Sequence, residues 1–196
     1  MKPIIAITAG DTNGVGYEVI IKSLLNGYVF EVMRPVIYGN AAVAKQHIHT
    51  LDEEYRNITW NLIDSPEQAK DGRLNLITCY TDNLPVELGK NTESSNKAAK
   101  AALDRACADL QAGRVQALVT APLNKEALGG GHTEYLEKRF QGDELMMLCS
   151  GNLRVALVCN HVALADIPAQ VFNSAKHLID LLIKSKVFHS VEDFAP

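Results

Sequence analysis

The chain has 196 residues, of which 47% are hydrophobic and 21% charged, with a formal net charge of −4. This composition is typical of a soluble globular protein of one or two domains, with a core that needs no disulfide or metal. No basic stretch stands out and no apolar run approaches the length of a membrane span. The N-terminal segment MKPIIAITAGDTNG is interpreted as a first strand, because its short apolar run is broken by Gly10 and Asp11 rather than followed by a signal-peptide cleavage site. We therefore expect a cytoplasmic protein with neither a nucleic-acid nor a membrane partner.

The N-terminal part of the chain alternates strands and helices. A continuous apolar run that ends in a glycine-bearing turn favours a strand buried on both faces, and helices are indicated by apolar residues at helical spacing. Asn40 is a candidate N-cap. Strands are predicted at Pro3–Ala9, Pro35–Tyr38, Ile58–Ile63 and Leu74–Thr78, and helices at Tyr17–Leu25 and from Asn40 to about His47.

The clearest element is a helix at Glu93–Gln111, with Thr92 as its N-cap and Gly113 beyond its end. A strand at Val115–Thr120 follows. Leu145–Cys149 and Leu153–Asn160 are separated by three residues, which favours an antiparallel hairpin. The last helix is predicted at Ser174–Ser185. The pattern predicts an α/β fold with a largely parallel, mixed sheet.

Two segments follow predicted strands at the edge where α/β sheets bind ligands. In GDTNGVGYE, Gly10–Glu18, Gly14 and Gly16 allow close backbone approach, and the following helix offers free N–H groups to an anion or a polar cofactor. The alternative is a tight turn with nothing bound. In TAPLNK, Thr120–Lys125, Lys125 is a candidate phosphate or acid/base group. The alternative is a solvated lysine.

Two further segments contain candidate histidines. In HTEYL, His132 can donate a hydrogen bond to a phosphate or carboxylate, and Thr133 can cap a following helix. His161 follows a very apolar strand, and its imidazole is a good metal ligand, although one histidine makes no metal site. The alternative for His132 is a surface-loop histidine, and the alternative for His161 is a hydrogen-bonded core or edge histidine. The four cysteines match no metal-binding spacing and favour buried thiols: Cys79, Cys107, Cys149 and Cys159.

Several segments, in this order, resemble the 4-hydroxythreonine-4-phosphate dehydrogenase family of pyridoxal phosphate biosynthesis: ITAGDTNGVGYEV, ALVTAPLNKEAL, GHTEYL, MML, LRVALV and the histidine of NHVAL. The first is also similar to the GDGIGPE loop of isocitrate and isopropylmalate dehydrogenases, whose α/β/α fold this family shares. The resemblance covers nearly the whole chain but only the first part of a family member.

The resemblance implies NAD-dependent oxidation of 4-phosphohydroxy-L-threonine to a 3-keto acid, which decarboxylates to 3-amino-2-oxopropyl phosphate. It also implies a divalent metal (Zn, Mg or Co) and a homodimer with a shared active site. The family's substrate-binding His-Thr pair falls on His132 and Thr133, and its first metal histidine on His161. It implies a first α/β subdomain at 1–128 and an incomplete second subdomain at 129–196.

The chain also departs from the family pattern. The Asn-Pro-His-Ala-Gly and Tyr-His-Asp-Gln segments, which carry the other metal histidines, do not occur in it. Three glycines, Gly129–Gly131, stand where the family has a longer connector. We therefore expect a C-terminally truncated chain that is inactive alone. The alternatives are a dehydrogenase of 4-phosphothreonate or 4-phosphoerythronate, and a non-catalytic remnant or binding module.

Overall fold

The computed structural model describes residues 2–25, 27–81, 84–141, 145–157, 159, 163–168, 171 and 179. The chain divides into two compact units, Met1–Phe140 and Gln141–Pro196. The family-based subdomain boundary at residues 128 and 129 stays a prediction. In the part of the chain that is described, no helix combines the length and the apolar character needed to cross a bilayer.

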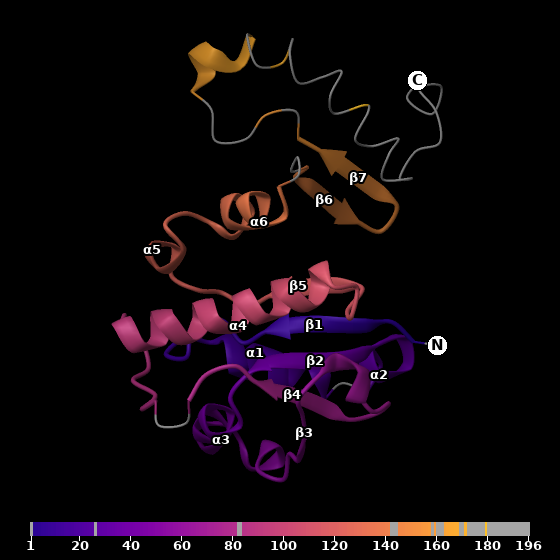
Figure 1. Ribbon diagram of the computed structural model, residues 1–196, viewed down its shortest axis with the longest axis vertical. Coiled ribbons are helices and arrows are strands. Elements are labelled where there is room, and N and C mark those ends of the chain that lie inside the picture. The colour runs from indigo at the N-terminus through magenta and orange to yellow at the C-terminus, as the bar shows by residue number, and fades with distance from the viewer. Residues whose placement is uncertain are drawn as a thin grey trace. The chain divides into compact units, whose positions relative to one another are not determined.

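The first unit is built on a five-stranded sheet in the order β3-β4-β2-β1-β5 (Figure 1). All its strand pairs are parallel, and the central strand β1 pairs with β2 on one side and β5 on the other, so that Ala6 lies opposite both Val36 and Leu118. The predicted parallel sheet is therefore confirmed. The strands are β1 Ile4–Thr8, β2 Arg34–Gly39, β3 Trp60–Ile63, β4 Leu74–Thr78 and β5 Ala117–Thr120.

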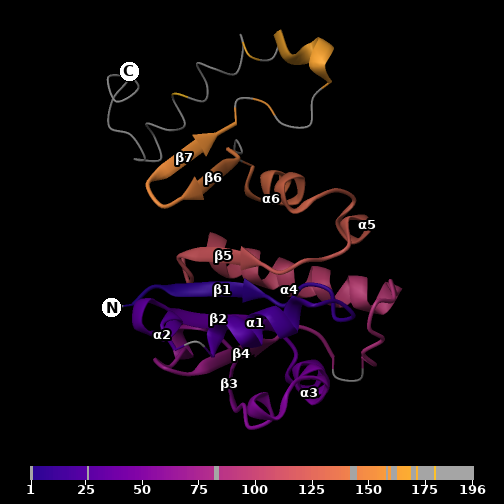
Figure 2. The ribbon, with the colours of Figure 1, turned by 180° about the vertical axis from the view of Figure 1, so that it is seen from behind.

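Helices cover both faces of this sheet. One core cluster joins α1 (Gly16–Leu24) and α3 (Ala41–Thr50) to the sheet, and a second cluster on the other face includes residues of α4 (Glu93–Gln111). Figure 1 shows the α4 side, and Figure 2 shows the α1 side. The remaining α-helices described in the unit are the short α2 (Val29–Val32) and α5 (Lys125–Leu128), and α6 (His132–Phe140). The sequence analysis missed α2 and α5, because four-residue helices have almost no periodicity to detect.

The direction of the chain explains this layering. The connections from β1 to β2 and from β2 to β3 run one way along the sheet, whereas those from β3 to β4 and from β4 to β5 run back. Right-handed crossovers place connections of opposite direction on opposite faces. The short β3–β4 connection accordingly contributes Ala69 to the same core cluster as Ala102 and Ala106 of α4.

Helix α4 has the bounds and the cap that its sequence predicts. Thr92 Oγ1 accepts a hydrogen bond from Ser95 N at 3.2 Å, and Gly113, with φ 70°, lies just beyond the end of the helix. The inner face of α4 is rich in small residues, which let the helix lie close to the sheet: Ala98, Ala99, Ala102 and Ala106 are all buried. Asn40 likewise caps α3, accepting from Ala42 N at 2.7 Å.

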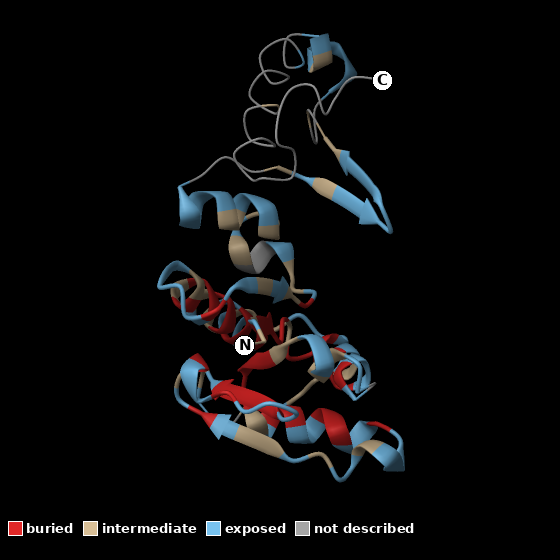
Figure 3. Cartoon of the chain, turned by 90° about the vertical axis from the view of Figure 1, so that its right-hand side faces the viewer, coloured by how far each residue is buried: buried red, intermediate tan, exposed pale blue. Residues whose placement is uncertain are grey.

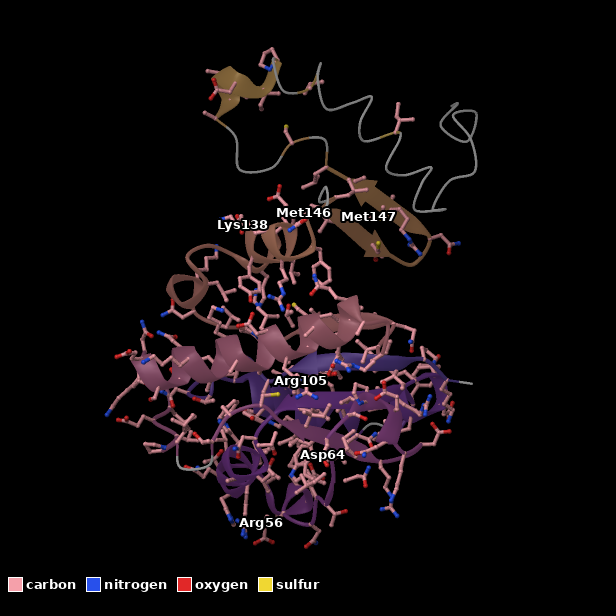
Figure 4. All side chains as sticks on the ribbon, in the orientation of Figure 1. Arg56, Asp64, Arg105, Lys138, Met146 and Met147 are labelled. Carbon is pink, nitrogen blue, oxygen red and sulfur yellow. The ribbon has the colours of Figure 1, made fainter. Side chains whose placement is uncertain are left out.

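A buried charge cluster fixes the other end of α4. Asp109 is fully buried and accepts a hydrogen bond from the Tyr38 hydroxyl at 2.7 Å. The guanidinium groups of Arg105 and Arg114 lie 3.3 and 2.5 Å from its carboxylate. Arg105 also donates to the Asp64 carbonyl at 2.9 Å, and both of these residues are labelled in Figure 4. The cluster therefore joins α4 to β2 and to the end of β3.

In the second unit, β6 (Met147–Ser150) and β7 (Leu153–Ala156) form the predicted antiparallel hairpin, with Leu148 opposite Val155. The strands are shorter than expected, and the turn between them is Gly151 and Asn152. Figure 3 shows buried residues in the sheet and the helices that cover it, and none among the described residues of the hairpin. The predicted helix at Ser174–Ser185 lies outside the described residues.

Candidate functional site

The candidate site is the edge of the sheet where β1 and β5 end. These strands are neighbours, with Thr8 opposite Thr120, and the chain leaves them towards opposite faces of the sheet. Such a topological switch point is where open α/β sheets bind ligands. The predicted segments Gly10–Glu18 and Thr120–Lys125 both begin here, so the structure brings them together.

Backbone contacts join these two segments directly. The Asp11 amide donates to the Pro122 carbonyl at 2.9 Å. Gly10 has a φ of 70°, and a Cβ added there would overlap the Pro122 carbonyl oxygen. A Cβ at Gly16 would overlap the Ala9 carbonyl oxygen. At Gly10 and Gly16 the close approach is thus made by the chain's own backbone, which favours the structural alternative for these glycines.

Asn13 connects the same loop to a third segment, residues 84–92. Its side chain is buried, accepts from Glu87 N at 2.8 Å, and donates to Lys90 O at 2.9 Å and Thr92 Oγ1 at 3.2 Å. The backbone carbonyl of Asn13 accepts a hydrogen bond from Gly89 N at 2.9 Å. This segment therefore becomes part of the candidate site.

His47, to which the sequence analysis gives no role, contacts the β1–α1 loop through its buried imidazole. Its Nε2 lies 2.8 Å from the Thr12 carbonyl, and since a carbonyl only accepts, Nε2 carries the proton. The ring stacks on Tyr17, with centroids 5.0 Å apart. Burial lowers the pKa of His47, so the folded protein favours the neutral imidazole.

Two tyrosines extend this buried network. The Tyr17 hydroxyl accepts from Asn40 N at 2.9 Å and lies 2.8 Å from the Tyr80 hydroxyl. Burial raises the pKa of Tyr17 to about 12 and raises the pKa of Tyr80 as well, so both are neutral phenols. A Cβ at Gly39 would overlap the Tyr17 hydroxyl. These groups come from separate segments, and no local motif indicates that they meet.

Lys125 is the first residue of α5, directly after the β5 loop, and its side chain is exposed. Its backbone carbonyl accepts from Gly130 N at 3.1 Å, and Gly129 between them has a φ of 66°. This is the left-handed conformation that commonly ends a helix. Gly129 thus has a local role in terminating α5, and both interpretations of the Lys125 side chain stay open.

His132 begins α6 and Thr133 is its second residue, so the prediction that Thr133 caps this helix is wrong by two positions. His132 is half-buried, and its Nε2 is a buried atom without a hydrogen-bond partner among the described residues. Burial lowers the pKa of this imidazole. A Cβ at Gly131 would lie 2.6 Å from Glu134 Oε2, so a carboxylate already lies beside the start of α6.

Polar contacts hold α6 on the outer face of α4. The Tyr135 hydroxyl donates to the Asp104 carboxylate, which also accepts from Lys100 Nζ at 2.7 Å. Gln111 Nε2 donates to the Arg139 carbonyl at 3.0 Å. The His-Thr pair is therefore carried by a helix that is anchored on α4 within the first unit.

The predicted metal ligand cannot be placed on this framework, because His161 lies outside the described residues. Among the residues that the structure does describe, no three His, Cys, Asp or Glu side chains gather in a way that could hold a metal ion. The assignment of His161 as a metal ligand therefore stays a prediction.

Comparisons with known proteins agree with the fold and the motifs. Residues 31–187 match the family model of the pyridoxal phosphate biosynthetic protein PdxA. A 4-hydroxythreonine-4-phosphate dehydrogenase of Bacteroides thetaiotaomicron is 36% identical over 193 residues, which are 94% of this chain and 51% of the relative. A protein of Oceanobacillus iheyensis, provisionally named D-threonate 4-phosphate dehydrogenase, is 39% identical over 173 residues, covering 83% of this chain and 51% of the relative.

A solved structure agrees with these sequence matches. The crystal structure of a 4-hydroxythreonine-4-phosphate dehydrogenase from Burkholderia phymatum superimposes with a TM-score of 0.75 at 33% identity, covering 94% of this chain and 59% of that one. The chain spans about half the length of the curated relatives it matches. The match of the family model to most of the sequence, together with this fold, shows that the chain belongs to the PdxA family of pyridoxal phosphate biosynthetic proteins.

Proposed function

We propose that this chain supplies the N-terminal half of an NAD-dependent dehydrogenase that oxidises 4-phosphohydroxy-L-threonine in pyridoxal phosphate biosynthesis. Family membership, with relatives named 4-hydroxythreonine-4-phosphate dehydrogenase, carries this proposal. The convergence of the glycine-bearing loop after β1 and the loop after β5 on the switch point of the sheet supports it. The enzyme is a cytoplasmic homodimer with a shared active site, and this chain alone is inactive.

The reaction transfers a hydride to NAD from the substrate carbon that bears the hydroxyl, and it removes a proton from that hydroxyl. The resulting 3-keto acid loses carbon dioxide and leaves 3-amino-2-oxopropyl phosphate. His161 would be one of the residues that hold a divalent metal, and such a metal would supply polarisation of the substrate hydroxyl. His132 and Thr133 contact the phosphorylated substrate, and the free hydrogen-bonding capacity of His132 Nε2 suits that role. Lys125, exposed after β5, binds phosphate or transfers a proton.

One observation favours a second substrate. The relative provisionally named for D-threonate 4-phosphate is as similar to this chain as the relative named for 4-hydroxythreonine 4-phosphate, at 39% and 36% identity. The two acids share the phosphate and the hydroxyl and differ in whether carbon 2 carries an amine or a hydroxyl. We therefore compare both substrates in the test.

The test measures NADH formation from each substrate with added divalent metal. It uses this chain and a chimera in which the unmatched second half of the Bacteroides relative is appended. We expect activity in the chimera alone. If the chimera fails to reduce NAD with every phosphorylated hydroxy acid that is tested, the dehydrogenase proposal is wrong. The non-catalytic alternative then gains support.

Three substitutions in the active chimera assign the residues. His132→Ala is expected to raise KM about 10- to 100-fold, the value of one hydrogen bond to a charged group. His161→Ala is expected to abolish metal-dependent turnover, and Lys125→Ala to lower kcat/KM. His49→Ala, an exposed histidine of α3, is the matched control and keeps wild-type kinetics. Unchanged metal affinity in His161→Ala, or wild-type kinetics in Lys125→Ala, removes the respective assignment.

A further inference from the structure

One side of α6 faces α4. Residues three and four positions apart share a side of a helix. The half-buried residues of α6 follow this spacing, whereas other positions are exposed: His132, Tyr135 and Leu136 are half-buried, and Thr133, Glu134, Glu137 and Lys138 are exposed. His132 and Tyr135 therefore lie on the same side of the helix, so a rotation of α6 that moves one of these side chains also moves the other.

Apolar packing holds α6 only weakly. None of its residues is buried, so little apolar surface is removed from water where the helix meets α4. The helix follows Gly129–Gly131, and glycine restrains the direction of the backbone less than other residues do. The position of α6 therefore depends on its polar contacts with α4.

The contact nearer the start of α6 joins Tyr135 to a carboxylate of α4. The Tyr135 hydroxyl donates to Asp104 Oδ1, and Lys100 Nζ donates to Asp104 Oδ2 at 2.7 Å. Lys100 Nζ also lies 5.6 Å from the centre of the Tyr135 ring, a distance at which a cation is attracted to the ring face. Burial alone raises the pKa of Asp104, but the hydrogen bonds from Lys100 and Tyr135 outweigh it and lower that pKa. Asp104 is therefore ionised at neutral pH and accepts a charge-assisted hydrogen bond from Tyr135.

A second contact lies one turn further along α6. Gln111 Nε2 donates to the Arg139 carbonyl at 3.0 Å, so this bond uses the backbone of the helix rather than a side chain. Tyr135 is about one helical turn from His132, whereas Arg139 is about two turns away. Of these two contacts, the one made by Tyr135 therefore has the greater effect on the position of His132.

We infer that Tyr135 and Asp104 are positioning residues, whose hydrogen bond sets the rotation of α6 on α4 and so holds the His132 imidazole where the substrate is bound. The buried Nε2 of His132 has no hydrogen-bond partner among the described residues, so a polar group of the substrate can bond to it. The substrate part of this inference rests on the proposed function, whereas the positioning of the imidazole does not.

An NMR titration of the histidine imidazoles tests the positioning in the chain itself, with the His132 signal identified by its loss in His132→Gln. Burial lowers the pKa of His132, so release of α6 should raise this pKa towards 6.5. We expect this rise in Tyr135→Phe and in Asp104→Ala. Loss of the Asp104 negative charge would by itself lower the pKa of a nearby imidazole, so a rise reports movement of His132.

Two further variants serve as controls. Asp104→Asn keeps an oxygen that accepts from the Tyr135 hydroxyl, so it should retain more of the wild-type behaviour of His132 than Asp104→Ala does. Tyr28→Phe, at a tyrosine that is 66% exposed, is expected to keep the wild-type pKa of His132. All these substitutions lie outside both core clusters, so we expect every variant to fold. A wild-type pKa of His132 in both Tyr135→Phe and Asp104→Ala overturns the inference.

Kinetics of the chimera test the substrate part. Tyr135→Phe is expected to raise KM for the phosphorylated substrate about 3- to 10-fold, the value of one hydrogen bond, and to leave KM for NAD unchanged. Because Tyr135 acts through His132, it should have no further effect when it is combined with His132→Ala. Additive effects of the two substitutions, or an equal rise in KM for NAD, contradict the inference. An inactive chimera removes the substrate part together with the proposed function, and the histidine titration then decides the positioning by itself.

Discussion

The Asn13 side chain is placed where three segments meet. It forms hydrogen bonds with Glu87, Lys90 and Thr92 while remaining almost fully shielded from solvent. Its backbone amide also donates to Asp11 Oδ1 at 2.9 Å. A residue that is typical of turns in the sequence is, in the structure, the connection between the β1–α1 loop and the start of α4.

Asn13→Ala is expected to lower the free energy of unfolding by about 3 kcal/mol, because it leaves buried partners without hydrogen bonds. Urea denaturation measures the loss, and hydrogen exchange should quicken in residues 84–92. Asn91→Ala is the matched control. Its carboxamide forms an exposed hydrogen bond with Asn96, so the change should stay within about 0.5 kcal/mol. Equal effects of the two substitutions would contradict the role of Asn13.

Buried histidine makes stability depend on pH. Burial lowers the pKa of His47 from 6.5 in the folded protein, whereas the unfolded chain takes up its proton near 6.5. The unfolded state therefore binds more protons between the two values, and the free energy of unfolding falls as pH drops below about 6.5. Burial of His132 lowers its pKa too and acts in the same direction.

His47→Gln should flatten part of this pH dependence between about pH 7.5 and 5, while the part due to His132 remains. Urea denaturation at several pH values measures the slope. His49→Gln, at an exposed position of the same helix, is expected to keep the wild-type slope. If His47→Gln has the wild-type slope too, His47 is not the group that resists protonation.

At the scale of elements, the turn from β1 to α1 contains two glycines, Gly14 and Gly16, that look alike in sequence. A Cβ at Gly16 would overlap the Ala9 carbonyl and lie 3.2 Å from the Ala121 Cβ. At Gly14 the nearest atom would be the Asp11 Cβ at 3.4 Å, an ordinary contact. Close packing of helix, strand and loop therefore requires glycine at only one of these two positions.

Gly16→Ala is expected to cost about 3 kcal/mol of unfolding free energy or more, because the strand and helix must separate. Gly14→Ala is its control and should change stability by less than about 1 kcal/mol, with a gain expected from the smaller entropy of the unfolded chain. Thermal and urea denaturation compare the two. Similar stabilities would show that the loop relaxes around the added methyl group.

Local sequence signals predict some elements better than others. The caps of α3 and α4 and the bounds of β4 and α4 agree with the sequence analysis, because Asn40, Thr92 and Gly113 act on their own neighbours. Strand β5 begins at Ala117 rather than Val115, because its length is set by pairing with β1. Thr133 lies inside α6 rather than at its N-cap, because the sequence pattern does not define the end of a helix to a single residue.

At the scale of the whole molecule, both described core clusters lie in the first unit. A fragment of residues 1–140 is therefore expected to fold alone, with one cooperative transition and an unfolding free energy close to that of the chain. Circular dichroism during urea denaturation tests this. A fragment of residues 1–128, which lacks α6, is the comparison. A broad, non-cooperative transition for residues 1–140 would show that the first unit needs the rest of the chain.

The sequence by itself determined the alternation of strands and helices, the parallel sheet, the hairpin and the family, because each rests on local periodicity, capping or an ordered set of motifs. Only the tertiary structure decided that β1 and β5 are neighbours and that their loops share a backbone hydrogen bond. It also decided that His47 supports Thr12, 35 residues away in sequence. Strand order and buried hydrogen bonds between distant segments depend on packing of the whole chain, and no stretch of sequence encodes them alone.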